Sequence, residues 1–283
     1  MADEARPLRE RPGAPEAYDA GGDRRPSMTD RRLFKMGSIA GIWGALVAFP
    51  FVVTHPHLPP GSAVGVLETV RDFGPWLFLH MGLMFVLIVI LLGLAAISRS
   101  VSEEKASSWA VCAFYVGIVG TVFGILGQGV DGLGFEVAKD IWVSANTADQ
   151  GTAVLVAGGV AGVATGIFIL VLFFYFGLTS IMYGLTFALS KEYPAWLTAM
   201  TLLGGALGMS AALATYYDDF SDPVYYGMFI PSAVLFLLWV LAASVILYRK
   251  HVWVAKPKAA KASPAPAGAG EGEPASAVST PEA

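Results

Sequence analysis

The sequence predicts an all-α fold, a polytopic bundle of six transmembrane helices with both termini in the cytoplasm. Hydrophobic residues make up 55% of the 283 residues and charged residues only 14%, against about 25% charged in a soluble domain. The charges gather at the ends and in short loops, which leaves apolar stretches of about twenty residues, enough to cross a hydrocarbon core. These stretches lack the alternation of barrel strands, and helices satisfy their own backbone hydrogen bonds in lipid.

Low-complexity tails flank the predicted membrane domain. Residues 1–33 are rich in Arg, Pro, Gly, Asp and Glu, and residues 251–283 in Ala, Pro, Gly, Ser, Lys and Glu. Such segments bury too little apolar surface to offset the entropy lost on ordering. We therefore expect two disordered cytoplasmic tails around a single membrane domain at residues 34–250.

The six spans follow one another with short connections, except at the fourth. Residues 151–190 carry no charge, and one straight helix of that length would measure about 60 Å, well beyond a bilayer. We expect a bend at Gly158, Gly159 and Gly162 that joins an outer helical segment to the membrane span. The predicted spans are residues 36–54, 76–98, 108–130, about 163–190, 195–217 and 228–248.

The orientation of the bundle follows from its lysine and arginine residues. With the N-terminus inside, sixteen of the 18 basic residues lie in cytoplasmic segments, and only Arg71 and Lys139 lie outside. This bias is the one seen in plasma-membrane proteins. The outer face then carries nine acidic residues and two basic ones, and we expect a multi-pass protein of the bacterial inner membrane.

The predicted spans contain no Asp, Glu, Lys or Arg. Ionisable residues in membranes usually mark ion paths and proton relays, so this composition argues against a proton pump or an ion-coupled transporter. The single cysteine, Cys112, allows neither an intrachain disulfide nor a thiolate metal cluster. No motif names a reaction, and no nucleic-acid partner is expected.

Polar residues gather at the outer ends of the predicted helices. His55 and His57 follow the first span, His80 lies one turn into the second, and Asp131 ends the third. Three histidines and an aspartate at one depth predict a zinc site with an open position for water. The alternatives are interfacial loop histidines, a hydrogen bond from His80 to a neighbouring helix, and a turn or helix end at Asp131-Gly132.

Glycines recur at helical spacing in two spans. Small residues at this spacing let helices approach closely in lipid, so we expect packing within the bundle, with self-association as an alternative. The glycines concerned are Gly117, Gly120, Gly124 and Gly127 in the third span, and Gly204, Gly205 and Gly208 in the fifth.

Several strings resemble those of a functionally uncharacterised family of bacterial six-helix integral membrane proteins, the DUF4386-like proteins. The resemblance covers residues 34–250 and implies a six-helix bundle in a bacterial plasma membrane, without implying a reaction, a ligand or a catalytic residue. The glycine-rich residues 151–166 depart from the more amphipathic segment expected there. The strings are THP (54–56), WLFLH (76–80), DG (131–132), AKDIW (138–142), LSKEYPAWL (189–197), FSD (220–222) and FIPSAVLFLLW (229–239).

Three functions are consistent with these observations. The charge-free bundle with glycine-faced helices favours a non-enzymatic scaffold or accessory subunit, without a cofactor, whose partners are the lipid bilayer and other membrane subunits. The first alternative is an outward-facing, zinc-dependent hydrolase acting on a lipid or another membrane-proximal substrate at His55, His57, His80 and Asp131. The second is a carrier for an apolar or uncharged solute.

Overall fold

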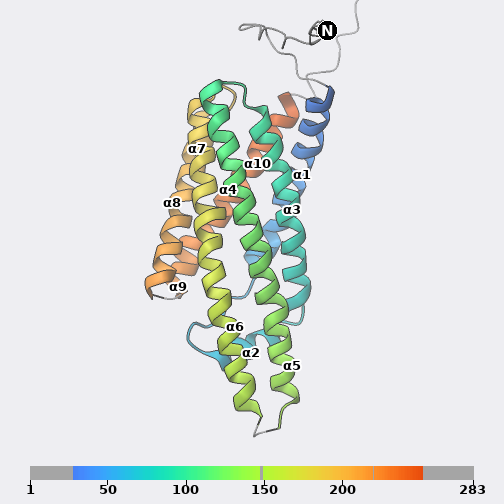
Figure 1. Cartoon of the computed structure of the whole chain (residues 1–283), viewed down its shortest axis with the longest axis vertical. Helices are drawn as coiled ribbons and strands as arrows, with labels where there is room; N and C mark the ends of the chain where they lie inside the picture. Colours follow the sequence, from blue (N-terminus) through green and yellow to red (C-terminus); the bar gives the residue numbers. More distant parts are fainter. Residues whose placement is uncertain (1–27, 147–148, 219, 251–283) are drawn as a thin grey trace, which may run out of the picture.

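The computed structural model describes residues 28–146, 149–218 and 220–250 (Figure 1). Within these ranges every regular element is helical, and six helices are long and apolar enough to cross a membrane, as predicted. The predicted tail residues 1–27 and 251–283 lie outside the described ranges. The first helix begins at Met28, before the predicted domain boundary at 34.

Each span is built from one helix or from consecutive helical segments. The first and second spans, α1 (Met28–Thr54) and α3 (Trp76–Ser100), are separated by the short α2 (Ala63–Asp72). The third span is α4 (Glu104–Gly129), η1 (Val130–Gly134) and α5 (Phe135–Ser144), and the fourth is α6 (Gln150–Leu170), η2 (Val171–Leu178) and α7 (Thr179–Leu189). The fifth is α8 (Ala195–Asp218), and the sixth is α9 (Asp222–Val224), η3 (Tyr225–Phe229) and α10 (Ile230–Tyr248).

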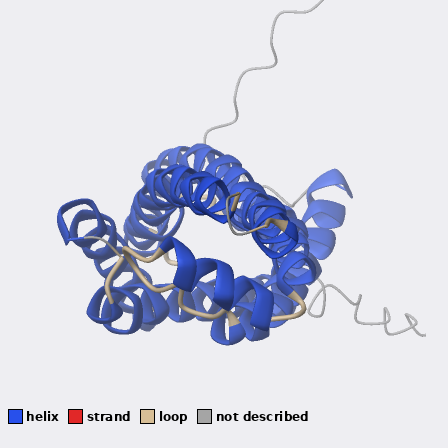
Figure 2. Cartoon of the chain, turned by 90° about the horizontal axis from the view of Figure 1, so that it is seen from below, coloured by secondary structure: helices blue, strands red, loops and turns tan. Residues whose placement is uncertain are grey.

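The six spans form a ring in chain order, seen end-on in Figure 2. Helix α1 packs against α3 and α10, α4 packs against α3 and α7, and α8 packs against α7 and α10. The beginning of α1 and the end of α10 lie at the same end of the ring (Figure 1), as an even number of spans requires. We call this end the terminal end.

Two of the spans continue far past the others at the opposite end. The helical runs Glu104–Ser144 and Gln150–Leu189 contain 41 and 40 residues, each about 60 Å at a rise of 1.5 Å per residue, roughly twice a hydrocarbon core. Helix α5 and the first half of α6 pair beyond the start of α3, and α2 packs across both (Figure 1). Leu67, Ala138 and Ala157 form a small buried core there. We call this end the hairpin end.

The fourth span differs from the predicted one in where its helix changes. An outer helical segment is present, but α6 runs as one α-helix through Gly158, Gly159 and Gly162, and α geometry gives way only at η2. Glycine costs a helix only about 1 kcal/mol per residue relative to alanine. Packing of α6 against α5 and α2 offsets that cost, so the helix continues through the glycines without ending there.

The glycines of α4 and α8 pack inside the bundle, which confirms their predicted role. A Cβ on Gly120 would stand 2.7 Å from the Cα of Tyr175, and one on Gly208 would stand 2.9 Å from the backbone nitrogen of Gly177. Only glycine permits such close approach.

The ring is filled unevenly along its axis. Toward the terminal end, Tyr183, Phe187 and Trp239 are buried against one another, with 5.2 Å between the ring centroids of Tyr183 and Trp239. Toward the hairpin end, the interior holds a cavity of about 560 Å³. The candidate site lies at the mouth of this cavity.

Candidate metal centre

The position of His55 follows from the proline after it. A residue before proline is disfavoured in the α region, and α1 ends at Thr54, directly before His55 and Pro56. The chain then runs through Pro59, Pro60 and Gly61, whose φ of 72° is left-handed, to Ser62. The Ser62 side chain caps α2 by accepting a hydrogen bond from the amide of Gly65. His55 is thereby held at the end of the ring instead of continuing the helix.

His80 and Asp131 are supplied by the two helices that face this loop. His80 lies in the second turn of α3 and its side chain is 1% exposed. Asp131 lies in η1, a π-helical segment inside the long third span, so Asp131-Gly132 is neither the turn nor the helix end considered from the sequence. Gly132 instead leaves room for His80, because a Cβ on Gly132 would stand 2.6 Å from the Cβ of His80.

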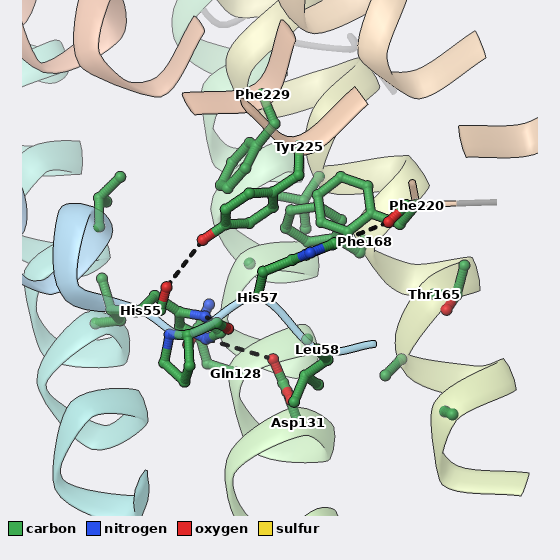
Figure 3. A pocket seen from close by; sticks show the side chains of 18 of the residues that line it. His55, His57, Leu58, Gln128, Asp131, Thr165, Phe168, Phe220, Tyr225 and Phe229 are labelled. Atoms are coloured by element: carbon green, nitrogen blue, oxygen red, sulfur yellow. Dashed lines mark hydrogen bonds and ion pairs between the residues drawn. The ribbon is translucent and has the colours of Figure 1, made fainter. Parts of the chain in front are cut away.

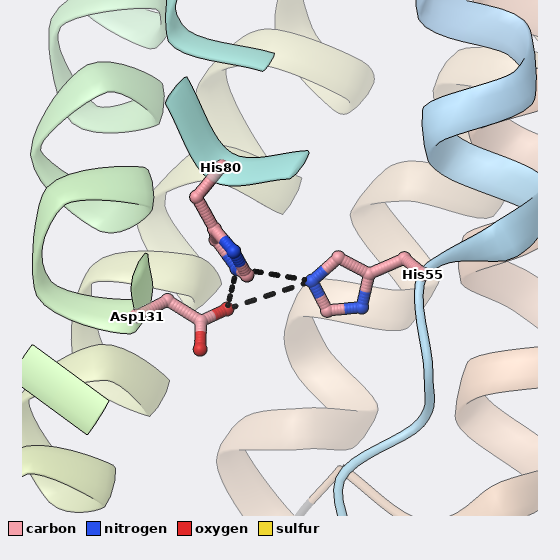
Figure 4. A group of neighbouring side chains, drawn as sticks. All are labelled: His55, His80 and Asp131. Atoms are coloured by element: carbon pink, nitrogen blue, oxygen red, sulfur yellow. Dashed lines mark hydrogen bonds and ion pairs between the residues drawn. The ribbon is translucent and has the colours of Figure 1, made fainter. Parts of the chain in front are cut away.

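The three side chains converge on one point (Figure 4). The Nε2 atoms of His55 and His80 are 3.2 Å apart, and Asp131 Oδ2 lies 3.2 Å from Nε2 of His80 and 3.8 Å from Nε2 of His55. A circle through these three atoms has a radius of about 2 Å, the length of a zinc–nitrogen or zinc–oxygen bond. The geometry therefore fits one small metal ion.

Hydrogen bonds assign the tautomers of both histidines. Nδ1 of His55 lies 2.9 Å from the carbonyl oxygen of Pro56, and Nδ1 of His80 lies 2.8 Å from that of Trp76. A carbonyl oxygen only accepts, so each Nδ1 carries a proton, and in the neutral form of each ring Nε2 presents a lone pair. Metal-ligating histidines are commonly held in this way. Two lone pairs and a carboxylate oxygen thus face one another, an arrangement that a cation stabilises.

The surroundings of His55 oppose its protonation. Burial lowers the pKa of His55, while the neighbouring Asp131 carboxylate raises it and His80 lowers it, with a net shift below the ordinary histidine value. A neutral imidazole is the form that binds a metal ion.

Two aromatic residues position the ligands from behind. The indole Nε1 of Trp76 donates to the carbonyl oxygen of Asp131 at 3.0 Å, and its ring lies 4.4 Å from that of His80. The hydroxyl of Tyr225 donates to the carbonyl oxygen of His55 at 2.9 Å. The sequence does not assign this role to Trp76 or Tyr225, because nothing in a linear pattern shows which carbonyl an aromatic side chain reaches.

His57, the fourth ligand predicted from the sequence, points elsewhere. Its Nδ1 lies 2.8 Å from Oδ1 of Asp222, and its Nε2 lies 3.0 Å from the carbonyl oxygen of Phe220. Its ring stacks on Tyr225 with 4.4 Å between centroids. Both partner atoms are acceptors. His57 thus fastens the loop after α1 to the connection between α8 and α9, and the structure brings together only three of the four predicted ligands.

A cavity adjoins the three ligands, with polar side chains beside them and apolar side chains farther away. Figure 3 shows His55, Gln128 and Asp131 on one side of it, and the aromatic side chains Phe168, Phe220 and Phe229 on another. His55, Gln128 and Asp131 line what we call the mouth of the cavity, and Nε2 of His80 lies 3.2 Å from Oδ2 of Asp131. Apolar side chains from α1, α3, η2 and α10 line the deeper part, among them Val52, Val86, Phe176 and Leu237. The π-helical segments η1, η2 and η3 each contribute lining residues, including Asp131 from η1, Tyr175 from η2 and Tyr225 from η3.

Unsatisfied acceptors face the mouth as well. Oδ1 of Asp131 and Oε1 of Gln128 are buried and have no hydrogen-bond partner among the described residues. Buried polar atoms usually have partners, and exceptions mark functional sites or bound groups. Deeper in the cavity, the hydroxyl of Tyr175 is also buried without a partner in the described part of the chain.

Comparisons of the chain with protein-family models, with curated proteins and with solved structures found no match. The resemblance to the DUF4386-like proteins therefore stays a prediction, and the functional argument depends on the geometry of the site.

Proposed function

We propose that this membrane protein is a hydrolase that acts at the outer surface of the bilayer, with one zinc ion held by His55, His80 and Asp131. The sequence alone favoured a non-enzymatic scaffold. The observation that supports the hydrolase is the triangle of three acceptor atoms at the mouth of a cavity. A catalytic zinc site typically has three protein ligands and an open position for water.

The metal ion and the side chains around it would have separate roles in such a reaction. Bound zinc would lower the pKa of a coordinated water toward about 7 and polarise the bond to be cleaved. Oδ1 of Asp131 and Oε1 of Gln128 are buried acceptors without a partner among the described residues, and they would accept hydrogen bonds from a group bound at the metal. In hydrolysis the water oxygen bonds to the attacked atom, the bond to the leaving group breaks, and a proton from the water passes to that group.

Elemental analysis of protein purified without a metal-affinity tag tests the proposal. We expect one equivalent of zinc per chain, which His80→Ala and Asp131→Asn lose while both variants stay folded. His57→Gln is the matched control, because its side chain faces Asp222, and we expect it to keep the metal. Protein that stays free of metal after incubation with zinc would have a proton shared among the three side chains instead, and the proposal would be wrong.

The identity of the metal is a second test. Two histidines and one carboxylate also bind Fe(II) in oxygenases, so purified protein that contains iron and not zinc would contradict the hydrolase. With zinc present, release of the head group from a labelled acyl lipid should require both Asp131 and His80. Metal-loaded protein that cleaves no ester, amide or phosphoester of a membrane lipid would also count against it.

The second candidate, an accessory subunit, is favoured by one surface. Helices α5 and α6 expose apolar side chains beyond the start of α3, with Val137, Ile141 and Leu155 exposed by 49%, 42% and 79%. Large exposed apolar surfaces often bind a partner. Cross-linking from these positions to one fixed membrane protein, abolished by Leu155→Lys but not by His80→Ala, would support this role. Cross-links to lipid alone would exclude it.

The orientation is part of the same proposal. The hairpin end faces outward in our assignment, because most basic residues belong to the terminal end and a plasma membrane retains such segments inside. The terminal end carries the ion pairs Asp30–Arg99 and Glu192–Lys250. In intact bacterial spheroplasts, a protease should cleave a site inserted between α5 and α6 and spare a tag at the C-terminus. The reverse pattern would contradict the assignment.

A further inference from the structure

The depth of the cavity matches one leaflet of a bilayer. Along α3, the lining residues run from Leu83 to Ile90, just below His80. Ten residues separate His80 from Ile90, which is about 15 Å at the helical rise. The hydrocarbon core of a bilayer is roughly 30 Å thick, so the tail of a lipid in one leaflet occupies about half of that. A tail hanging from the metal centre would therefore reach the floor of the cavity.

The chemistry of the walls separates a head region from a tail region. The polar side chains His55, Gln128 and Asp131 lie at the mouth. The floor is formed by Ala48 of α1, Ile90 of α3 and Phe236 of α10. A cavity of about 560 Å³ lies within the range for drug-sized ligands. That volume suits one hydrocarbon chain.

We propose that the substrate is a single-tailed acyl lipid, with its tail inside the ring and the ester or amide bond between tail and head at His55, His80 and Asp131. This inference rests on the proposed hydrolase. The tail enters along the axis of the ring, and its head group stays between the loop after α1 and helix α6. Both of these line the mouth. Hydrolysis then adds water across the acyl bond and releases a fatty acid and a free head group.

Tail binding and metal binding depend on different residues, so they can be tested separately. Native mass spectrometry of the purified protein with saturated lysophosphatidylcholines, from octanoyl to stearoyl, reports how many lipids each chain retains. We expect one lipid per chain, with retention rising as the tail lengthens until it fills the cavity. The tail-free glycerophosphocholine should not be retained. His80→Ala should keep the lipid and lose the metal.

Two substitutions fill the cavity at different depths. Ala48→Phe places a ring at the floor, and Gly162→Leu adds a side chain at a lining position where a Cβ meets nothing within 4 Å. We expect each to lower the retained fraction about tenfold, because the added side chain occupies space that the tail would otherwise fill. Val47→Phe, next to Ala48 but facing outward with 38% exposure, is the control and should retain the parent's lipid.

Each outcome decides between the two proposals. Equal retention by the parent and both cavity-filling variants, or retention that ignores tail length, overturns the tail-binding inference even if zinc is present. Tail-dependent retention without any metal or hydrolysis leaves the lipid site standing, removes the hydrolase and favours a lipid carrier. Retention of a two-tailed phospholipid in preference to the lysolipid contradicts the single-tailed substrate.

Discussion

Gly132 lies directly against His80, and a Cβ added to Gly132 would stand 2.6 Å from the Cβ of His80 and 3.0 Å from its Cγ. The absence of a side chain on η1 therefore sets how closely α3 can approach the segment that carries Asp131. The distance between two of the three candidate ligands depends on this approach, and it is the same distance that a metal ion would have to bridge.

Gly132→Ala is expected to push His80 away from Asp131 and to weaken zinc binding at least about tenfold, because a supporting change around a metal site typically costs 10–100-fold. Competition with a chromophoric chelator measures this affinity. The matched control is Gly129→Ala, whose Cβ would meet nothing within 4 Å and which should bind zinc like the parent. Equal affinities for the two variants would show that Gly132 does not set the site.

Tyr225→Phe is expected to loosen His55 without removing a ligand. It deletes the hydrogen bond from the Tyr225 hydroxyl to the carbonyl oxygen of His55 and keeps the ring that stacks on His57. Zinc affinity should fall by about tenfold with little change in thermal stability. Tyr226→Phe, on a neighbouring residue that is 61% exposed, should leave the affinity unchanged, and a loss of similar size there would argue against a positioning role for Tyr225.

Tyr175 and Tyr183 should respond oppositely to loss of the hydroxyl group. The Tyr183 hydroxyl lies 2.6 Å from Ser98 Oγ and donates to the carbonyl oxygen of Leu94 at 3.0 Å. The Tyr175 hydroxyl is buried and has no hydrogen-bond partner among the residues that the structure describes. Tyr183→Phe should therefore lower the free energy of unfolding by about 1 kcal/mol, and Tyr175→Phe should leave it unchanged or raise it by a similar amount. Denaturant unfolding in mild detergent measures both, and a loss in Tyr175→Phe would reveal an unseen partner for its hydroxyl.

Glu103 should contribute an acid-sensitive part of the stability at the terminal end. Partial burial raises the pKa of its carboxyl group, but hydrogen bonds from the Lys191 amide at 2.9 Å and the Ser190 hydroxyl at 3.1 Å outweigh this, so the pKa lies below its ordinary value. Its contribution is therefore complete above the pKa of the unfolded chain and is lost as the pH falls through the lower, folded value.

Glu103→Gln should cost less than about 1 kcal/mol at neutral pH, as is usual for exposed charged groups. It should also flatten the fall of the thermal midpoint between neutral and acidic pH. The control is Glu104→Gln, one residue along the same helix start. An unchanged pH profile for Glu103→Gln would show that these hydrogen bonds do not contribute to acid sensitivity.

The sequence was sufficient for the membrane spans and for part of the site. Hydrophobic length alone locates six spans, because a hydrocarbon core requires about twenty apolar residues of any helical sequence. His55, His80 and Asp131 could be placed at one depth because each lies near an end of its predicted span. The depth of a residue along the bundle does not determine the direction of its side chain, however. His57 lies at the same depth, but its side chain contacts Asp222.

Two further differences from the sequence prediction concern glycine. Glycine at Asp131-Gly132 and at Gly158, Gly159 and Gly162 suggested helix ends or bends, because glycine lowers helix propensity and is common in turns. The same missing side chain also permits close packing inside a helix, which is its role at Gly132. Sequence alone does not show which neighbour a glycine will meet. Tyr225 was missed for a similar reason, since its partner is a backbone carbonyl 170 residues away in sequence.

The three π-helical segments give the cavity a particular dependence on residue count. A π turn holds one residue more than an α turn, so the helix beyond it is rotated by about 100° relative to an uninterrupted helix. Asp131, Tyr175 and Tyr225 each lie in such a segment and each lines the cavity. The rotation of each helix about its own axis therefore determines which side chains line the cavity. Deleting a single residue from η1, η2 or η3 would rotate the helix beyond it and turn different side chains toward the cavity. One-residue deletions would therefore reshape the interior of the ring, as changes of side-chain size also would.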